Sequence, residues 1–361
     1  MSAVYVHIPF CRTICPYCDF VRVRDRGAPV DAFVDALRRE IAWASPEDAP
    51  LRSVFFGGGT PSLLDEAQLG EILDALDRRF GLSTAVEVTL EANPDDVTAE
   101  KAWTWRRLGV NRVSLGVQSF DDAALRYLGR RHGADGARRA CEAIRDAFAN
   151  WSMDLIYGAR PVGAWTATLE ECVRFDPPHV SAYGLTYEAG TSFERRRGEA
   201  IEDDDSLALY REPRAALGAW KHYEISNFAR PGRESVHNLV YWRNEAYHGF
   251  GTGAYSFLHG VRARNTTDLH AYLAHPGAKC ESLGLTLREV RLETVIQHMR
   301  LADGLTHAAY RRRFGRALRD DFGPALDALA ARGLLSDDGV CVRPTAAGFE
   351  LNNEIGLALI G

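Results

Sequence analysis

HIPFCRTICPYC, residues 7–18, decides how this chain is interpreted, because it places Cys11, Cys15 and Cys18 at spacings of four and three. In a compact loop all three thiols can point into one cavity. Thiolates bind zinc or iron–sulfur clusters, and their softness alone does not choose between the two. Three unrelated buried thiols explain this density poorly. The segment therefore predicts a metal centre near the N-terminus.

The number of ligands narrows the choice of metal. A structural zinc site takes four ligands, so a fourth would have to be remote or be His7, which stands awkwardly on a strand before Pro9. A 4Fe–4S cluster ordinarily takes four cysteines as well. With three cysteines, one iron stays open and can bind a substrate or cosubstrate. We therefore favour a 4Fe–4S cluster, with zinc as the alternative.

The composition is that of an ordinary globular protein. With 46% hydrophobic residues, 25% charged residues and a formal net charge of −6 over 361 residues, nothing points to a nucleic-acid partner. No secretory signal and no apolar run long enough for a transmembrane helix are visible. The remaining cysteines are scattered, unlike a secreted disulfide framework: Cys141, Cys172, Cys280 and Cys341. We expect a cytoplasmic protein without stable membrane insertion.

Strand and helix patterns alternate over the first 260 residues. Short apolar runs predict strands at residues 4–8, 53–56, 87–91, 112–117, 153–157 and 179–185. Apolar spacings of three and four predict helices at residues 30–43, 67–80, 123–129 and 136–148. This series predicts an α/β fold with a parallel sheet, either doubly wound or an incomplete TIM-like barrel.

The pattern changes near residue 286. Before it, residues 199–205 predict an acidic loop and residues 223–228 a further strand. After it, residues 292–301 and 321–335 predict helices, and residues 335, 340–342 and 348–360 predict a small wing and a closing helix. We expect a core domain of residues 1–260, a linker of residues 261–285 and a winged-helix-like domain of residues 286–361, with a structural or lid role.

Polar residues follow the predicted strands at the edge where barrels and open sheets place their sites. The segment GGGTP, residues 57–61, follows one strand, and its glycines allow close backbone approach. Glu91 and Gln118 end the next two strands, Arg130 follows one helix later, and Asp154 lies within the next strand. Each residue alone is compatible with a solvated loop or a capped turn.

The spacing Cys-x-x-x-Cys-x-x-Cys with an aromatic residue at Tyr17 resembles the radical S-adenosylmethionine (SAM) superfamily. In that family the open iron of the 4Fe–4S cluster chelates SAM. One electron from the reduced cluster then yields methionine and a 5′-deoxyadenosyl radical. The resemblance implies a (β/α)6 radical SAM barrel and an electron donor for the cluster.

Within the superfamily, the chain resembles the coproporphyrinogen dehydrogenase (HemN-like) branch over residues 4–265, and more loosely beyond. By this resemblance Tyr5 lies beside the cluster and SAM. The same resemblance implies contacts with the amino acid part of SAM by Gly58, Gly59 and Thr60, and contacts with its carboxylate, ribose or adenine surroundings by Glu91, Gln118, Arg130 and Asp154.

Three features favour the HemW-like heme chaperones of this branch over its dehydrogenases. Phe20 stands where the dehydrogenases have the last cysteine of a Cys-x-Cys ending, and Cys11 comes too early for their N-terminal extension. The third feature is HNLVYW, residues 237–242, which resembles a motif associated with heme binding.

This motif has a physical interpretation for heme and another without it. A neutral imidazole such as His237 can ligate heme iron, Tyr241 and Trp242 can stack on a porphyrin face, and Asn238 can orient a ring nitrogen or propionate. Alternatively, His237 and Asn238 pin a loop while Trp242 fills the core. Other residues stay open as axial ligands: His222, His248 and Cys280.

The resemblance implies a heme chaperone that binds heme and passes it to acceptor proteins such as respiratory cytochromes. One alternative is an oxygen-independent coproporphyrinogen III dehydrogenase, which decarboxylates propionate side chains by radical chemistry. Another is a radical SAM enzyme that acts on a different tetrapyrrole. A glycine-rich turn, GFGTGA at residues 249–254, also occurs in this branch.

Overall fold

The computed structural model describes residues 3–45 and 50–361, and within them one large sheet of twelve strands forms the main body. The strand order is β14-β13-β12-β11-β1-β4-β5-β6-β7-β8-β10-β9. Its parallel centre comprises β1 (Ala3–Ile8), β4 (Ser53–Gly58), β5 (Glu87–Ala92), β6 (Arg112–Gln118), β7 (Trp151–Tyr157) and β8 (His179–Gly184). All of these strands were predicted from their apolar runs.

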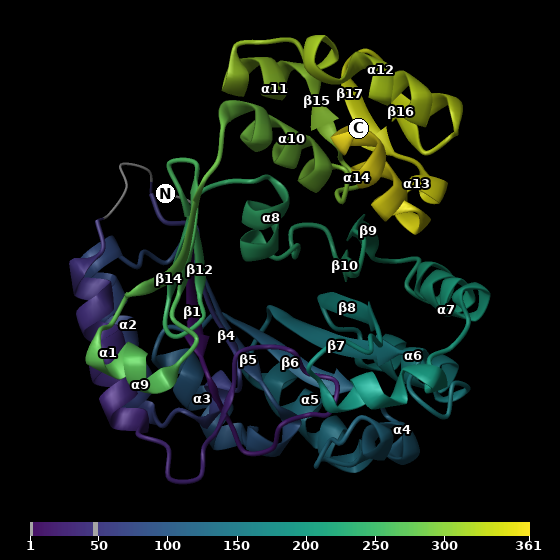
Figure 1. Ribbon diagram of the computed structural model, residues 1–361. Helices are drawn as coiled ribbons and strands as arrows, with labels where there is room; N and C mark the ends of the chain where they lie inside the picture. The colour runs from purple at the N-terminus through teal and green to yellow at the C-terminus, as the bar shows by residue number, and fades with distance from the viewer. Residues whose placement is uncertain (1–2, 46–49) are drawn as a thin grey trace.

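Crossover helices cover the convex side of this sheet (Figure 1). They are α1 (Val30–Trp43), α2 (Glu66–Phe80), α3 (Ala99–Arg107), α4 (Asp122–Tyr127), α5 (Ala134–Ala147), α6 (Ala164–Phe175) and α7 (Asp203–Ala216). The main hydrophobic core lies between these helices and the sheet, with Val6, Phe33 and Leu37 fully buried in it. The expected incomplete (β/α)6 barrel is confirmed over the doubly wound sheet, because the helices cover one side of the sheet and the strand order does not close (Figure 1).

One edge of the sheet continues past β1 through residues that were expected to be a linker. Strand β11 (Tyr247–Phe250) pairs parallel with β1, and an antiparallel set follows: β12 (Tyr255–Leu258), β13 (Val261–Asn265) and β14 (Lys279–Gly284). Helix α9 (Leu269–Ala274) joins the last two strands. Residues 261–285, expected to be a linker, therefore form strands and a helix instead. The side chains of β14 are all exposed, so its sequence carries no apolar alternation.

The other edge also differs from the prediction. The single strand expected at residues 223–228 is two antiparallel strands, β9 (Lys221–Glu224) and β10 (Asn227–Ala229). The Glu224 carboxylate accepts the backbone N–H of Ser226 at 3.1 Å, which stabilises the turn between them. The acidic loop expected at residues 199–205 is shorter, since Asp203 already begins α7, where acidic side chains favour a helix N-terminus. A 3-10 turn, η3 (Ser192–Glu199), precedes it.

The C-terminal domain has its own hydrophobic core, which includes Val295, Leu326 and Val342. Its helices are α10 (Leu287–His298), α11 (His307–Phe314), α12 (Leu318–Ala331), α13 (Ala346–Glu350) and α14 (Asn352–Ile360). A small sheet, fully within the described residues 285–361, has the order β15 (Leu305–Thr306), β17 (Cys341–Pro344), β16 (Leu335–Asp337). The closing helix expected at residues 348–360 is split into α13 and α14 at Leu351.

The C-terminal domain lies over the concave side of the main sheet, with α8 (Val236–Trp242) between the two (Figure 1). Short elements lie near the ends of the parallel strands: β2 (Phe10–Cys11), β3 (Val23–Arg24), η1 (Pro61–Leu63) and η2 (Pro94–Asp96). No helix within residues 3–45 and 50–361 is long and apolar enough to cross a membrane.

Candidate functional site

The cysteine segment is a loop closed at its base by backbone pairing. Strands β2 and β3 pair in parallel, and the N–H of Val23 donates to the carbonyl of Pro9 at 2.8 Å. Within the loop, the N–H of Cys18 donates to the carbonyl of Cys15 at 3.1 Å, which forms a tight turn. Cys11 is buried, while Cys15 and Cys18 are half-buried. Sequence spacing therefore placed all three thiols on one short, constrained loop.

The three thiols share one electrostatic environment. The pKa of the Cys11 thiol is raised to about 11, mainly by burial; the hydrogen bond from Thr60 lowers it, and the neighbouring Cys18 and Cys15 raise it. Burial likewise raises the pKa of Cys18. These thiols become thiolates when a metal centre supplies positive charge, since coordination deprotonates a thiol outright. The residues thus fit a thiolate-ligated centre.

His7, the fourth ligand that a closed zinc site could use, is engaged in other hydrogen bonds. Across residues 3–45 and 50–361, no three Cys, His, Asp or Glu side chains converge closely enough to hold a single metal ion. The His7 Nε2 lies 2.7 Å from the carbonyl of Val21, and its Nδ1 lies 3.0 Å from the Tyr5 hydroxyl. Both nitrogens of His7 are engaged, so it is no fourth zinc ligand here.

The glycine segment after β4 packs directly on the strand that leads to the cysteines. A Cβ on Gly58, whose φ is +105°, would lie 2.4 Å from the His7 ring, and a Cβ on Gly59 would lie 2.6 Å from the Pro9 backbone. The next residue, Thr60, donates its hydroxyl to the Cys11 Sγ at 3.6 Å. The glycines therefore serve close backbone packing beside the thiols.

Two neighbouring carboxyl groups, those of Glu91 and Asp154, repel each other when both are ionised. The Glu91 Oε2 accepts the N–H of Gly58 at 3.2 Å, and Asp154 accepts hydroxyl bonds from Ser114 at 2.7 Å and Ser152 at 2.8 Å. Burial, and then the nearby charge of Asp154, raise the pKa of Glu91 to about 8. A bound cation would relieve this repulsion, which suits a ligand with ammonium and sulfonium groups.

Arg130 links the cysteine loop to two strand ends. Its guanidinium donates to the Cys15 Sγ at 3.5 Å, to Asn93 Oδ1 at 2.5 Å and to the carbonyl of Gly116 at 3.0 Å. Gln118 ends β6 with a φ of +66°, and a Cβ on Gly116 would lie 2.8 Å from its amide nitrogen. Such left-handed backbone at a non-glycine residue clusters at functional sites.

Sequence reasoning missed Asn93 as a site residue. Its side-chain amide donates to the Thr60 hydroxyl at 3.2 Å while its oxygen accepts from Arg130. The sequence showed only an Asn-Pro turn after a strand, and no local signal identifies these two partners. Asn93 therefore joins the glycine segment to the arginine.

Tyr5 lies between the cysteine segment and the motif at residues 237–242. Its hydroxyl contacts His7, and its ring lies 6.0 Å from the His7 ring, 6.3 Å from Phe55 and 6.3 Å from His237. Burial, followed by the charge of Glu91, raises the pKa of Tyr5 well above its usual value. The structure thus brings Tyr5 near Glu91 as well as near the motif.

The motif at residues 237–242 forms helix α8 rather than a loop. Ser235 caps the helix by accepting the N–H of Asn238 at 3.3 Å. The His237 ring is buried, with its Nδ1 2.9 Å from the Ser53 hydroxyl and its Nε2 2.9 Å from the Tyr241 hydroxyl. Burial, and then the charge of Arg112, lower the pKa of His237 to about 3, so the imidazole is neutral. His237 therefore anchors α8 to β4.

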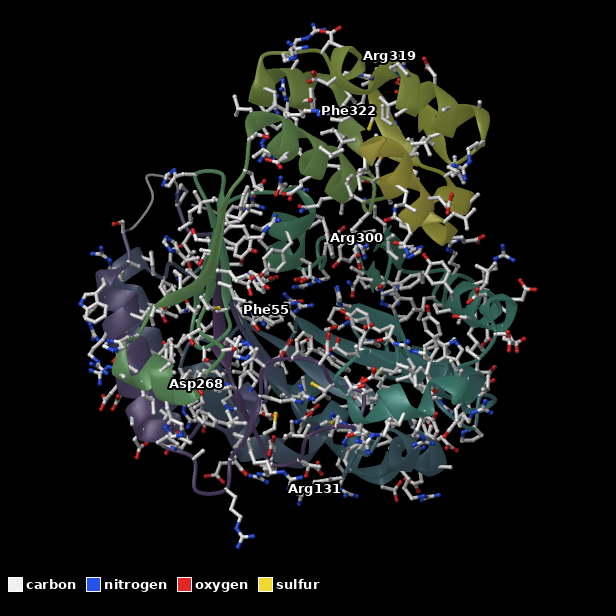
Figure 2. All side chains as sticks on the ribbon, in the orientation of Figure 1. Phe55, Arg131, Asp268, Arg300, Arg319 and Phe322 are labelled. Carbon is white, nitrogen blue, oxygen red and sulfur yellow. The ribbon has the colours of Figure 1, made fainter. Side chains whose placement is uncertain are left out.

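The end of α8 reaches the C-terminal domain. The side chains of Phe55 and Arg300, labelled in Figure 2, mark two sides of this helix. The His237 ring stacks on Phe55 with ring centroids 5.0 Å apart, and the Arg300 guanidinium lies 4.3 Å over the Trp242 ring. The motif thus connects the sheet with the domain that covers it.

The other candidate heme ligands lie apart from one another. His222 is stacked on Phe228 at 4.2 Å, and its Nε2 lies 3.0 Å from the carbonyl of Ile225. His248 is buried on β11 and stacks on Phe250 at 5.6 Å. Cys280, on β14, is exposed. Phe20, which follows the cysteines, is also exposed, at 61%.

Comparison with known proteins identifies the fold and the family of the chain. The family model of the radical SAM superfamily matches residues 5–164, and that of the HemN C-terminal domain matches residues 285–351. The solved structure of coproporphyrinogen III oxidase (HemN) from Escherichia coli covers 99% of this chain and 89% of its own, with a TM-score of 0.86 and 23% identity. This likeness shows the fold. The fold and the cysteine loop define a radical SAM protein.

Curated relatives narrow the class. The heme chaperone HemW of Lactococcus lactis is 34% identical over 98% of this chain and 96% of its own length. HemW of Bacillus subtilis is 34% identical over the full length of both proteins, and HemW of Escherichia coli is 33% identical over 93% of this chain and 92% of its own. The chain belongs to the HemW family.

Proposed function

We propose that the chain is a heme chaperone of the cytoplasm, which binds heme and transfers it to acceptor proteins such as respiratory cytochromes. The observation that carries this proposal is the similarity to heme chaperones over both domains, from the cysteine loop to α14. A fragment-level match would support only the shared barrel.

The first part of the proposal is a 4Fe–4S cluster held by Cys11, Cys15 and Cys18, with SAM beside it. When bound and reduced, the cluster supplies the electron that splits the carbon–sulfur bond of SAM. The chain's own contribution is orientation and charge. Glu91 and Asp154 face the cationic cosubstrate, while Thr60 and Arg130 hold two of the thiols by hydrogen bonds.

The other predicted SAM residues keep their roles within this proposal. Gly58 and Gly59 present backbone beside the cysteines, Gln118 stands at the strained end of β6, and Tyr5 lies near Glu91. In this proposal these residues together line the SAM site beside the cysteine loop.

The second part of the proposal is heme binding next to α8. Both nitrogens of His237 are engaged, so ligation of iron would require the loss of its bond to Ser53 or to Tyr241. We therefore assign His237 the anchoring role, and Asn238, Tyr241 and Trp242 the support of the heme site. Among the alternative ligands weighed, Cys280 presents an exposed side chain.

Spectroscopy of anaerobically reconstituted protein tests both parts. We expect a broad absorbance near about 400 nm from the cluster, which Cys15→Ala abolishes. Heme titrated into the protein should give a Soret band that saturates at a heme concentration set by the protein concentration. Cys280→Ser should shift the position of this band. Protein that takes up neither cluster nor heme would contradict the proposal.

A second assay separates the chaperone from the dehydrogenase. Incubation with coproporphyrinogen III, SAM and a reductant, without oxygen, should yield no protoporphyrinogen. Product above background would assign the decarboxylation reaction to this chain instead. The likeness to HemN at 23% identity concerns the fold and does not favour that reaction.

A further inference from the structure

The glycine-rich turn at residues 249–254 packs against both ends of the cysteine segment. Gly251 has a φ of +94°, and a Cβ there would lie 2.4 Å from the carbonyl oxygen of His7. Gly253 has a φ of +71°, and a Cβ there would lie 2.7 Å from the Val21 side chain. His7 precedes the first cysteine and Val21 follows the last. The turn therefore braces the loop where it begins and where it ends.

The two braced residues are themselves joined, since the His7 ring contacts the carbonyl of Val21 at 2.7 Å. On its other side, His7 meets Gly58, so it is held between two glycine segments. A movement of the turn would therefore shift the base of the cysteine loop.

A buried carboxylate holds this turn in place. Glu40, on α1, accepts the N–H of Gly251 at 2.9 Å, the side-chain amide of Asn265 at 2.7 Å and the hydroxyl of Tyr272 at 2.6 Å. Asn265 also donates to the carbonyl of Gly251 at 2.7 Å. Both polar groups of the Gly251 backbone are thus fixed by one network, which draws on α1, β13 and α9.

Burial of the Glu40 carboxylate costs free energy, and this cost indicates a specific role for the side chain. Glu40 is 6% exposed, and Asn265 and Tyr272 are fully buried. Lys279 is the nearby cation, and its ammonium contacts the Asn265 side chain. Burial raises the pKa of Glu40, which its hydrogen bonds from Gly251, Tyr272 and Asn265 oppose. Buried charges of this kind are expensive unless they are fully hydrogen-bonded, and fully satisfied networks are rigid.

We propose that Glu40 is a positioning residue for the iron–sulfur cluster: it fixes Gly251 against His7, and with it the turn whose Gly253 packs on Val21, and so sets the geometry of the three cysteine thiols. This role rests on the proposed ligation of the cluster by Cys11, Cys15 and Cys18. Glu40 acts through the backbone and touches neither thiols nor cosubstrate.

The test compares Glu40→Gln with Asp35→Asn, an exposed carboxylate on the same helix whose partner is Arg38. The full chain is reconstituted without oxygen, and electron paramagnetic resonance of the reduced cluster is recorded with and without SAM, normalised to cluster content. In Glu40→Gln we expect altered g-values or line widths and a raised SAM dissociation constant, because the weaker network lets the base of the cysteine loop shift. Asp35→Asn should match the wild type.

A purely structural role gives a different result. It would lower the melting temperature of the apoprotein while the remaining clusters kept the wild-type spectrum and SAM affinity, which would overturn the inference. If Glu40→Gln fails to fold, Tyr272→Phe removes a single bond to the carboxylate and should show the same spectral change in smaller measure. An unchanged spectrum in that variant would also overturn it. A wild-type protein without any cluster would instead contradict the proposed function.

Discussion

Cys11 and Cys15 are joined by a continuous path of hydrogen bonds through side chains from other strands. Thr60 donates to Cys11, Asn93 donates to Thr60, and Arg130 contacts both Asn93 and Cys15. The path runs along the carboxyl ends of β4 and β5 to the loop after α4. Residues at the strand ends therefore hold two of the thiols in place.

Replacing Asn93 should interrupt this path. We expect Asn93→Ala to leave the Thr60 hydroxyl and the Arg130 guanidinium without their shared partner, and to weaken SAM binding by about ten-fold. Calorimetric titration of the reconstituted protein with SAM measures this affinity. Asn352→Ala, which removes an amide that donates to Met299 in the C-terminal domain, is the control. Equal affinity in the two variants would show that the path is dispensable.

SAM binding should strengthen as the pH rises through about 8. Glu91 has its pKa raised to about 8, so the carboxylate that favours a cation forms mainly above that pH. Because the folded pKa lies above the unfolded value, the apoprotein loses stability as the pH rises from about 4.3 through about 8. Glu91→Gln should remove both dependences, which affinities and melting temperatures at pH 6 and pH 9 measure. A pH profile of Glu91→Gln identical to the wild type would assign the titration to another group.

His237→Ala should destabilise the protein by about 3 kcal/mol, because it leaves the hydroxyls of Ser53 and Tyr241 unpaired in a buried site. Denaturant unfolding of the apoprotein gives this value. Tyr241→Phe removes one of the two bonds and should cost less. An axial-ligand role for His237 makes a different prediction. Tyr241→Phe would then free the His237 Nε2 and preserve the Soret band of bound heme, whereas His237→Ala would abolish that band. We expect both folded variants to keep the band position.

Glu350 holds the C-terminal domain to α7 through Arg211, with bonds of 2.9 and 2.6 Å, and Arg214. These partners are partly exposed, so Glu350→Gln should cost about 1 kcal/mol at neutral pH. The hydrogen bond from Arg211 lowers the pKa of Glu350, so this stability is present above the unfolded pKa of about 4.3 and is lost as the pH falls through the folded value. Urea unfolding midpoints of the variant and the wild type at pH 7 and pH 3 check this pH dependence. A difference between the two proteins that persists at pH 3 would disprove that the ionised Glu350 carboxylate is its source.

The parts of the fold with strong local patterns were predictable. Helix α1 spans residues 30–43 as expected, because its apolar residues recur at spacings of three and four. Helix α3 was not predicted, since its nine residues include adjacent arginines and an exposed Trp103. Strand β14 was mistaken for part of a linker because an exposed edge strand needs no apolar face.

The site was predictable to the extent that it follows the strand ends. Glu91 and Gln118 were identified because parallel strands bring their carboxyl ends to one edge. Asn93 and Glu40 were not, since their partners lie on other elements and only the folded structure joins them. His237 was recognised as part of a motif, but its two hydrogen bonds, which exclude a free imidazole, depend on Ser53 and the turn of α8.

The pairing of β1 with β11 has a consequence for biosynthesis. Residues 3–6 leave the ribosome more than 200 residues before their partners at residues 247–250 and the adjoining Gly251 and Gly253. The cysteine loop of the nascent chain therefore lacks its contacts with Gly251 and Gly253 during most of translation. Iron–sulfur loading of the cysteine loop should therefore follow the synthesis of β11 and of the turn that carries Gly251 and Gly253.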